Sequence, residues 1–323
     1  MVLKSFLVRL LFALVLNPLN LPAQDSGCTR HTVAVGVVDR DWNLVRGLGA
    51  ANFHGKVRGS DVQILSTSID TSPRRIVLLL DASGSMMGEG CETAKVVAEY
   101  LIRLAPPQAS LAQMGFSGTV RYTADFYQDR SELMKTLADL LKLCGAPRGR
   151  TALFDAISSG LTTVGSLGVG DVIYAVTDGG DNASRTDPGK VEKALLTEGV
   201  RLFAVVTSSE TPTNRRSSEV TEGANRLRSM VEATGGNMLT LQYGSVVQGS
   251  HIKAHTNEEA LNLALQRMYQ QMGEFYRVEV SLPEQFEKPT KWKLEVIDAN
   301  GRPVRGVEVH YPQELMPCAN ASP

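Results

Sequence analysis

The sequence contains little cysteine and little histidine, four and five residues in a chain of 323. No two cysteines form a C-x-x-C pair, so we expect no zinc site built from cysteines. His251 and His255 have the spacing of a helical zinc pair, but no glutamate follows His251 and the segment is typical of a loop. We therefore expect no histidine zinc site either.

Positive charge is not in excess, because the formal net charge is −1. The basic run Arg215-Arg216 stands beside Glu219 and Glu222 in a predicted helix, which is typical of a solvated helix face. Nucleic-acid-binding domains carry clustered positive charge. The sequence therefore predicts no nucleic-acid partner.

Long hydrophobic runs are missing as well, except at the N-terminus. Residues 1–23 combine Lys4 and Arg9 with an apolar run, Leu10 to Leu16, and are typical of a secretory signal peptide cleaved after Ala23. An uncleaved anchor is the alternative, but the run is too short to span a bilayer comfortably. We predict an exported protein, periplasmic or extracellular, with no transmembrane segment in the mature chain.

Between residues 74 and 276 apolar strands alternate with amphipathic helices. The expected strands cover residues 76–80, 110–116, 120–126, 171–176, 200–206 and 238–241, and the expected helices cover 92–104, 131–141, 152–164, 188–198, 219–234 and 257–275. This alternation predicts an α/β domain with a doubly wound, mostly parallel six-stranded sheet flanked by helices.

Both ends of the chain read as strands without helices. An N-terminal β segment, residues 28–72, and a C-terminal β segment, 277–318, are expected to pair in a small accessory sheet. Four cysteines in an exported chain permit two disulfides in three pairings. We favour Cys91–Cys144 within the main domain and Cys28–Cys318 between the two ends.

Polar residues follow the apolar run Ile76 to Leu80, which reads as a strand buried on both faces. Asp81, Ser83 and Ser85 stand at alternate positions and can turn toward one point. A carboxylate and two hydroxyls are hard oxygen donors that suit Mg²⁺ or Mn²⁺ better than zinc. A plain turn is the alternative, because Asp and Ser also bond their own backbone.

A second apolar strand, Asp171 to Val176, ends in a similar way, at Thr177-Asp178-Gly179. Ligands of doubly wound sheets bind outside the carboxyl ends of the strands. Asp81 and Asp178 are both expected at these ends. Their positions predict a common site.

The D-x-S-x-S stretch resembles the metal-ion-dependent adhesion site of von Willebrand factor A (VWA) domains. Thr151, in Gly-Arg-Thr-Ala-Leu-Phe-Asp-Ala, is similar to the second-loop threonine of that family, and Asp178 is similar to its third-loop aspartate. Ala233-Thr-Gly-Gly236 before a strand resembles the bacterial secreted VWA-related group in particular. The resemblance covers about two-thirds of the chain, from residue 74 to residue 275.

The resemblance implies that Ser83 and Ser85 coordinate a cation directly, and that Thr151, Asp81 and Asp178 do so directly or through water. One coordination position is then open to a Glu or Asp of a protein ligand. The sequence departs from the family at Arg150, where glycine is commoner; this cation either steers an acidic partner or points to solvent, and we favour the second. Asp181 is either a supporting group or a loop residue. Asp155 is explained by its place at a helix start.

Catalysis finds little support in the sequence. No G-x-S-x-G elbow surrounds Ser83 or Ser85, and no histidine lies in the three site loops. We therefore expect a non-enzymatic, exported binding protein that captures an acidic residue through the cation. The alternative is a structural component of an envelope assembly, in which the metal stabilises the domain and the β segments make the contacts.

Overall fold

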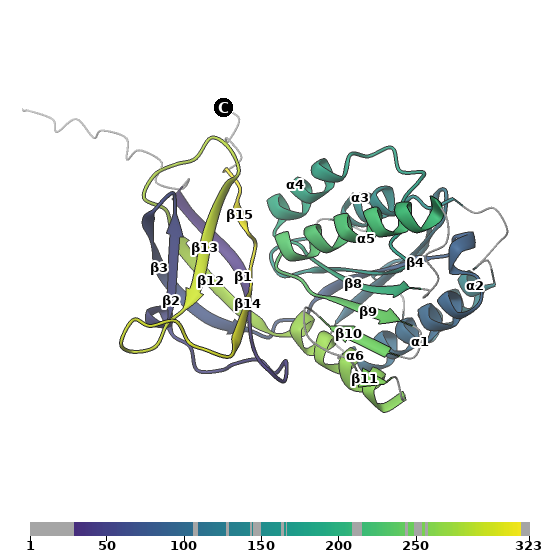
Figure 1. Cartoon of the computed structure of the whole chain (residues 1–323), viewed down its shortest axis with the longest axis horizontal. Helices are drawn as coiled ribbons and strands as arrows, with labels where there is room; N and C mark the ends of the chain where they lie inside the picture. Colours follow the sequence, from purple (N-terminus) through teal and green to yellow (C-terminus); the bar gives the residue numbers. More distant parts are fainter. Residues whose placement is uncertain are drawn as a thin grey trace, which may run out of the picture.

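A computed structural model describes most of residues 29–317. The residues that it does not describe within this range are 106–108, 127–128, 143, 145–149, 163–164, 166, 209–214, 243–244, 249–253 and 256–257. The predicted signal peptide lies outside the described residues. Two bodies stand side by side in Figure 1, a domain of strands alone and an α/β domain.

The α/β domain is built on an eight-stranded sheet in the order β11-β10-β9-β8-β7-β4-β5-β6. Its strands are β4 (Arg75–Asp81), β5 (Ser110–Phe116), β6 (Val120–Ala124), β7 (Val172–Thr177), β8 (Arg201–Ser208), β9 (Met238–Gln242), β10 (Ser245–Gln248) and β11 (Ala254–His255). The five from β9 to β5 run parallel, while β6, β10 and β11 are antiparallel to their neighbours. The doubly wound fold is confirmed. Strands β10 and β11 extend it beyond the six predicted strands, and β11 takes up part of the expected 251–255 loop.

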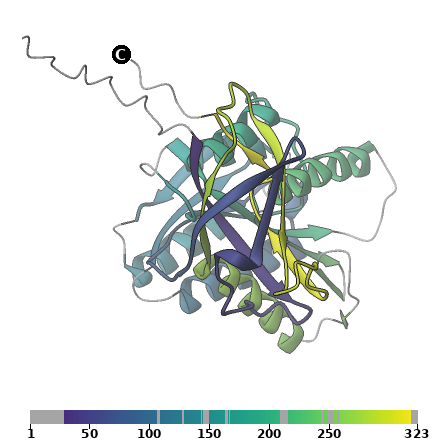
Figure 2. The same cartoon turned by 90° about the vertical axis from the view of Figure 1, so that its left-hand side faces the viewer.

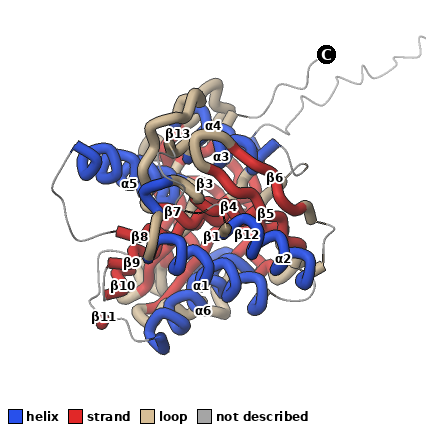
Figure 3. Tube along the Cα trace, turned by 90° about the vertical axis from the view of Figure 1, so that its right-hand side faces the viewer, coloured by secondary structure: helices blue, strands red, loops and turns tan. Residues whose placement is uncertain are grey.

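Helices cover both faces of this sheet (Figure 3). They are α1 (Glu89–Leu104), α2 (Arg130–Leu141), α3 (Leu153–Thr162), α4 (Pro188–Glu198), α5 (Arg215–Ala233) and α6 (Glu258–Gly273). Leu78 and Leu80 of β4 pack with α1, α2 and α6, whereas Val77 and Leu79 pack with α3, α4 and α5. Strand β4 is thus buried on both faces, as its unbroken apolar run predicts.

The second domain is a seven-stranded antiparallel sheet in the order β14-β1-β12-β3-β2-β13-β15. Its strands are β1 (Arg30–Asp39), β2 (Phe53–Val57), β3 (Ser60–Asp70), β12 (Phe275–Ser281), β13 (Thr290–Val296), β14 (Val307–His310) and β15 (Glu314–Leu315). The predicted pairing of the two ends of the chain is confirmed, although the sheet is larger than expected. Strands β13 and β14 touch despite their distance in the sheet order, so the sheet curls around its own core (Figure 2).

The α/β domain is inserted between β3 and β12. The last residue of β3, Asp70, is the register partner of Phe275, the first residue of β12. The chain therefore leaves the β-domain and returns to it at neighbouring positions of the same sheet.

Two turns of the β-domain repeat each other. Residues 37–43 read Val-Val-Asp-Arg-Asp-Trp-Asn, and residues 296–302 read Val-Ile-Asp-Ala-Asn-Gly-Arg. Asp39 Oδ1 accepts backbone N–H groups two and four residues ahead at 2.8 and 2.9 Å, and Asp298 Oδ1 does the same at 2.8 and 2.9 Å. Trp42 and Gly301 occupy the same left-handed position, with φ of 65° and 74°. The β-domain thus contains two related hairpin units.

The Ala233-Thr-Gly-Gly236 segment lies at the contact between the two domains. Gly235 has φ of 72°, and a Cβ there would lie 2.8 Å from the backbone of Tyr311. Beside it, the backbone N–H of Gln313 donates to the carbonyl oxygen of Ala233 at 2.9 Å. This motif therefore packs against the C-terminal segment of the β-domain.

The Cys91–Cys144 disulfide is present, with an S–S distance of 2.06 Å. The predicted Cys28–Cys318 pair lies outside the described residues. None of the helices in the described part of the chain has the length and apolar character that a membrane crossing requires.

Candidate metal centre

The first predicted site loop leaves the carboxyl end of β4. Asp81 is the last residue of that strand and is buried, with 1% of its surface exposed. Ser83 is also fully buried and precedes a 3₁₀ turn, Gly84–Met86, that carries the exposed Ser85. The loop therefore runs from the interior to the surface at the sheet edge.

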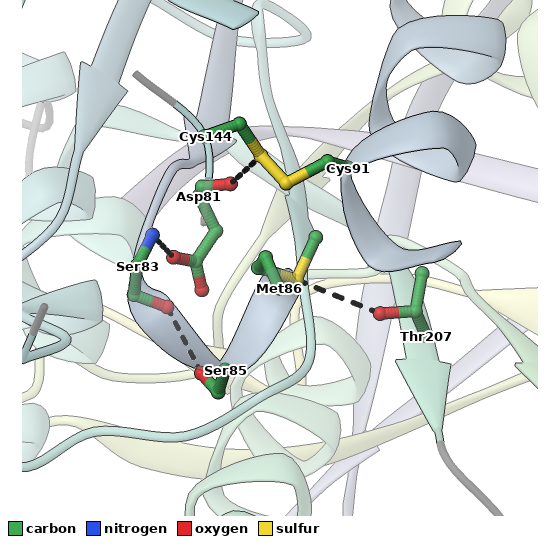
Figure 4. The surroundings of a disulfide bond; sticks show 7 residues. All are labelled: Asp81, Ser83, Ser85, Met86, Cys91, Cys144 and Thr207. Atoms are coloured by element: carbon green, nitrogen blue, oxygen red, sulfur yellow. Dashed lines mark hydrogen bonds between the residues drawn. A yellow bond between two sulfur atoms is a disulfide. The ribbon is translucent and has the colours of Figure 1, made fainter. Parts of the chain in front are cut away.

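Hydrogen bonds set the direction of the side chains in this loop (Figure 4). The backbone N–H of Ser83 donates to Asp81 Oδ1 at 2.9 Å, and the hydroxyl oxygens of Ser83 and Ser85 lie 3.0 Å apart. Met86 is buried below them, where its sulfur accepts a weak bond from the Thr207 hydroxyl at 3.6 Å. The anchored Met86 leaves both serine hydroxyls on the same side of the loop.

The loop after β7 lies against the same carboxylate. The Thr177 hydroxyl donates to Asp81 Oδ2 at 2.6 Å, and Asp178 Oδ1 accepts the backbone N–H of Gly180 at 2.9 Å. Gly179 has φ of 85°, and a Cβ there would lie 2.7 Å from the Cβ of Ala224 in α5. Only glycine fits this close approach, which fixes the path of the loop.

The two aspartates make this edge electrostatically unfavourable for the protein alone. Burial, and then the negative charge of Asp178, raise the pKa of Asp81 to about 7, against the bonds that it accepts from Thr177 and Ser83. Among the residues that the structure describes, neither carboxylate forms an ion pair. A buried carboxylate pair without a counter-charge, beside two hydroxyls, is a donor set that fits a hard divalent cation.

The second predicted loop, which contains Thr151, is held against the loop after β7 through its main chain. Thr151 is buried at the start of α3, and its N–H donates to Asn182 Oδ1 at 3.0 Å. Its carbonyl oxygen accepts the N–H groups of Asn182 and Ala183, each at 2.9 Å. Thr151 is thus joined to a segment that begins four residues after Asp178.

Arg150, Asp181 and Asp155 all have partners in the structure. The exposed Arg150 donates to the carbonyl oxygen of Asn182. Asp181 accepts the N–H of Leu153 at 2.8 Å, and Asp155 accepts backbone N–H groups of the loop after β7 at 2.8 and 3.1 Å. The place of Asp155 at a helix start therefore explains only part of its role, because its carboxylate also accepts hydrogen bonds from the loop after β7.

The disulfide stands next to the site. Cys91 lies in the first turn of α1, directly after the first site loop, and Cys144 follows α2 (Figure 4). The sulfur of Cys144 is 3.8 Å from the main-chain oxygen of Asp81. Sequence reasoning paired these cysteines but did not place them at the site. A disulfide of this kind fits an extracellular or periplasmic protein.

No group of three His, Cys, Asp or Glu side chains suited to a metal occurs within the described portion of the chain. The candidate centre differs from such groups because hydroxyls make up most of its donors. Asn182 and Ser184 are further polar residues of the site region that the sequence analysis did not identify, and it gave Thr177 no role of its own. The polar run after β7, Thr-Asp-Gly-Gly-Asp-Asn-Ala-Ser, is the feature that contains them.

Residues 76–234 match the von Willebrand factor type A domain family. No curated protein sequence matches the chain. Among solved structures, the chain is similar to the conserved hypothetical protein BatB from Bacteroides thetaiotaomicron, with 15% identity and a TM-score of 0.44 over 61% of this chain and 98% of that one.

Two further solved structures are similar. One is proximal thread matrix protein 1 from the mussel byssus, with a zinc-occupied MIDAS motif, at 14% identity and a TM-score of 0.45 over 65% of this chain and 49% of that one. The other is the human COPII-coat protein Sec24c, at 12% identity and a TM-score of 0.43 over 76% and 44%. Likeness at this level carries no information on function.

Proposed function

Because residues 76–234 of this chain are a von Willebrand factor type A domain, we propose that the protein is a non-enzymatic binding protein that holds Mg²⁺ or Mn²⁺ at its sheet edge. VWA domains are protein-interaction modules, and the proposed partner is a protein that supplies a Glu or Asp carboxylate. The supporting observation is the buried pair Asp81 and Asp178, which lacks a counter-charge among the described residues and lies beside two aligned serine hydroxyls.

In this proposal the cation is held by Ser83, Ser85 and Thr151 together with the carboxylates of Asp81 and Asp178. When bound, the metal supplies a positive centre that accepts one more carboxylate oxygen. The two aspartates balance its charge, and the hydroxyls are weak donors, so an incoming anion is favoured. The Ser83 N–H and the Thr177 hydroxyl hold Asp81 in place for this role.

The remaining parts of the proposal concern location and chemistry. We propose export to the periplasm or the cell exterior after removal of residues 1–23, which agrees with the disulfide. The domain limits, 28–72, 74–276 and 277–318, belong to the same proposal. We assign no catalysis, because no histidine among the described residues bonds to Ser83 or Ser85.

A calorimetric titration tests the cation site. We expect the metal-free mature protein to bind Mg²⁺ and Mn²⁺, and Asp81→Asn to bind neither while keeping its circular dichroism spectrum. Asp139→Asn is the matched control, because Asp139 is an exposed aspartate paired with Lys142 on α2. Equal binding by wild type and Asp81→Asn would contradict the proposal.

Displayed random peptides test the second half of the proposal. Peptides selected on the wild-type protein in Mg²⁺ and released by a chelator should be enriched in Asp and Glu, and Asp81→Asn should select no such set. Peptides that stay bound in chelator would favour the alternative, a structural envelope component. The β-domain has its own core and stands beside the α/β domain as a separate body (Figure 1), which is the observation that supports this alternative.

A further inference from the structure

The metal centre takes its donors from three separate loops, and one of them has a distinctive attachment. Thr151 stands at the start of α3, on a different element from Asp178. Its N–H and C=O groups are both bonded to residue 182, through Asn182 Oδ1 at 3.0 Å and the Asn182 N–H at 2.9 Å. A residue bonded at both main-chain groups has little freedom to shift.

The same loop completes the N-terminus of α3. The first N–H groups of a helix have no partner within the helix and need caps. Here the caps come from the loop after β7: Asp181 Oδ1 accepts the Leu153 N–H at 2.8 Å, and the Ser184 hydroxyl oxygen accepts the Asp155 N–H at 3.1 Å. Ser184 in turn donates to Asp181 Oδ1 at 2.6 Å.

The attachment also runs in the opposite direction. The Asp155 carboxylate accepts the N–H groups of Arg185 and Thr186 at 2.8 to 3.1 Å, and hydrogen bonding by these groups holds its pKa below the ordinary value despite partial burial. We call the bonded segments 150–155 and 181–186 the clasp. Within the first segment, Arg150, Thr151, Leu153 and Asp155 each bond to a residue of the second segment.

The consequence for the site is geometric. Asp178 lies three residues before the clasp, and Gly179 and Gly180 between them follow a path fixed by the contact of Gly179 with α5. Supporting groups that orient ligands commonly change metal affinity by about 10–100-fold when removed. The clasp connects Thr151 to residue 182, four positions along the chain from Asp178.

We propose that Asn182 is a positioning residue, which sets Thr151 against Asp178 so that the two ligands are presented as one rigid unit. This inference rests on the proposed function of the site as a cation centre. Asn182 is singled out because its side chain bonds Thr151 itself, whereas the side chains of Asp181 and Ser184 bond later positions, Leu153 and Asp155 of α3. Its side chain is exposed, so its truncation opens no cavity in the core.

Two substitutions at this position separate positioning from stability. Asn182→Ala removes the oxygen that accepts the Thr151 N–H, whereas Asn182→Asp keeps such an oxygen. Asn300→Ala is the matched control, an exposed asparagine in a turn of the β-domain. All are compared with wild type by Mg²⁺ titration calorimetry, and by hydrogen exchange of the 150–155 segment in chelator.

We expect Asn182→Ala to raise the Kd for Mg²⁺ by about tenfold or more, and to speed exchange in residues 150–155 without metal. Asn182→Asp should recover most of the affinity and protection, and Asn300→Ala should match wild type in both. Melting temperatures in chelator should differ little among the four proteins.

Three results overturn the inference. Unchanged exchange in Asn182→Ala would show that the clasp does not depend on this side chain. Faster exchange with an unchanged Kd would show that the clasp does not position the metal ligands. Failure of the wild-type protein itself to bind Mg²⁺ would instead refute the proposed function, and the inference with it, whatever the exchange data show.

Discussion

The two ends of the α/β sheet treat buried charge in opposite ways. At the carboxyl ends of the strands, neither Asp81 nor Asp178 has an ion pair in the described structure, and burial and the charge of Asp178 raise the pKa of Asp81. At the amino ends, near the β-domain, Asp70 accepts the Arg74 guanidinium at 2.5 Å and that of Arg277 at 2.8 Å. Although burial alone would raise the pKa of Asp70, bonds from Ser72, Arg74 and Arg277 hold it well below its usual range.

Further arginines complete the amino end. Asp171 binds Arg75 at 2.6 Å, and the fully buried Arg201 donates to the carbonyl oxygens of Gln271 and Met272 at the end of α6. Burial, and then repulsion from Arg74, lower the pKa of Arg201 to about 9, so it stays charged at neutral pH.

The contrast separates buried charge that is balanced within the protein from buried charge that is not. Where the protein supplies its own counter-ions, the buried Asp70 joins the end of β3 to Arg74 at the start of the α/β domain. Asp81 and Asp178 have no counter-ion among the described residues, and their negative charge favours binding of a cation from solution. Four changes would test this difference, in order of decreasing effect.

Asp70→Asn should have the largest effect. It leaves Arg74 buried without its carboxylate partner, and removal of one member of a buried pair costs about 3–5 kcal/mol. Urea unfolding measures the loss. Asp139→Asn, in an exposed pair, should cost under about 1 kcal/mol, and a similar loss in both variants would show that the amino-end pair is not structural.

Metal removal should have the next largest effect on stability. This effect should depend on the residues at the carboxyl ends of the strands and not on those at the amino ends. At a Mg²⁺ concentration 100 times its Kd, the wild-type protein should gain about 2.7 kcal/mol of stability over the protein in chelator. Asp70→Asn should keep this gain, since its damage lies at the other end, whereas Asp81→Asn should lose it. Thermal unfolding with and without Mg²⁺ measures this gain in each protein. An equal gain in Asp81→Asn would show that the stabilising metal does not bind at the carboxyl ends of the strands.

Opposite pH dependences should follow from the two carboxylates. Asp70 has a lowered pKa in the folded protein, so its stabilisation is present above the unfolded pKa of about 3.9 and fades as the pH falls below it. Asp81 has a raised pKa, so without metal its contribution to stability falls as the pH rises from about 4 to about 7.

The difference in stability between wild type and Asp81→Asn isolates the second effect. In chelator, the free energy of unfolding of wild type should fall relative to that of Asp81→Asn as the pH rises from about 4 to about 7, by at most about 1.4 kcal/mol per pH unit. With saturating Mg²⁺ the shift should vanish, because the cation favours the ionised form. A flat difference in chelator would show that Asp81 ionises normally in the folded state.

Met87 should give the smallest effect. It is 68% exposed, in the loop that follows Ser85. Met87→Ser should leave stability within about 0.5 kcal/mol and Mg²⁺ binding unchanged. It should weaken the selected acidic peptides by about 1 kcal/mol, roughly fivefold, if they rest on this side chain. Val304→Ser, in the β-domain, should not weaken them.

The sequence predicted the parts of this molecule that are local. The alternation of strands and helices indicated the doubly wound sheet, and the residues after β4 and β7 indicated where polar groups gather, because carboxyl ends of parallel strands meet at one edge. Pairing of the first and last strands followed from the absence of helices at both ends.

What the sequence left out depends on contacts between distant segments. Arg201 reads as an ordinary charge at a strand start, and its carbonyl partners lie some 70 positions further along. Asn182 reads as a loop residue, and its bond to Thr151 spans 31 positions. The strands β10 and β11 are short, and no alternation of apolar and polar residues predicts them.

The insertion of the α/β domain between β3 and β12 also delays strand pairing during synthesis of the chain. Strand β1 pairs only with β12 and β14 among the strands described, so its neighbours emerge from the ribosome about 240 residues later, about 12 to 50 s at 5–20 residues per second. Throughout that delay the apolar stretch from Val33 to Val38 is without its sheet, while the α/β domain between can already fold. The nascent chain therefore depends on whatever shields this one strand until its last partner arrives.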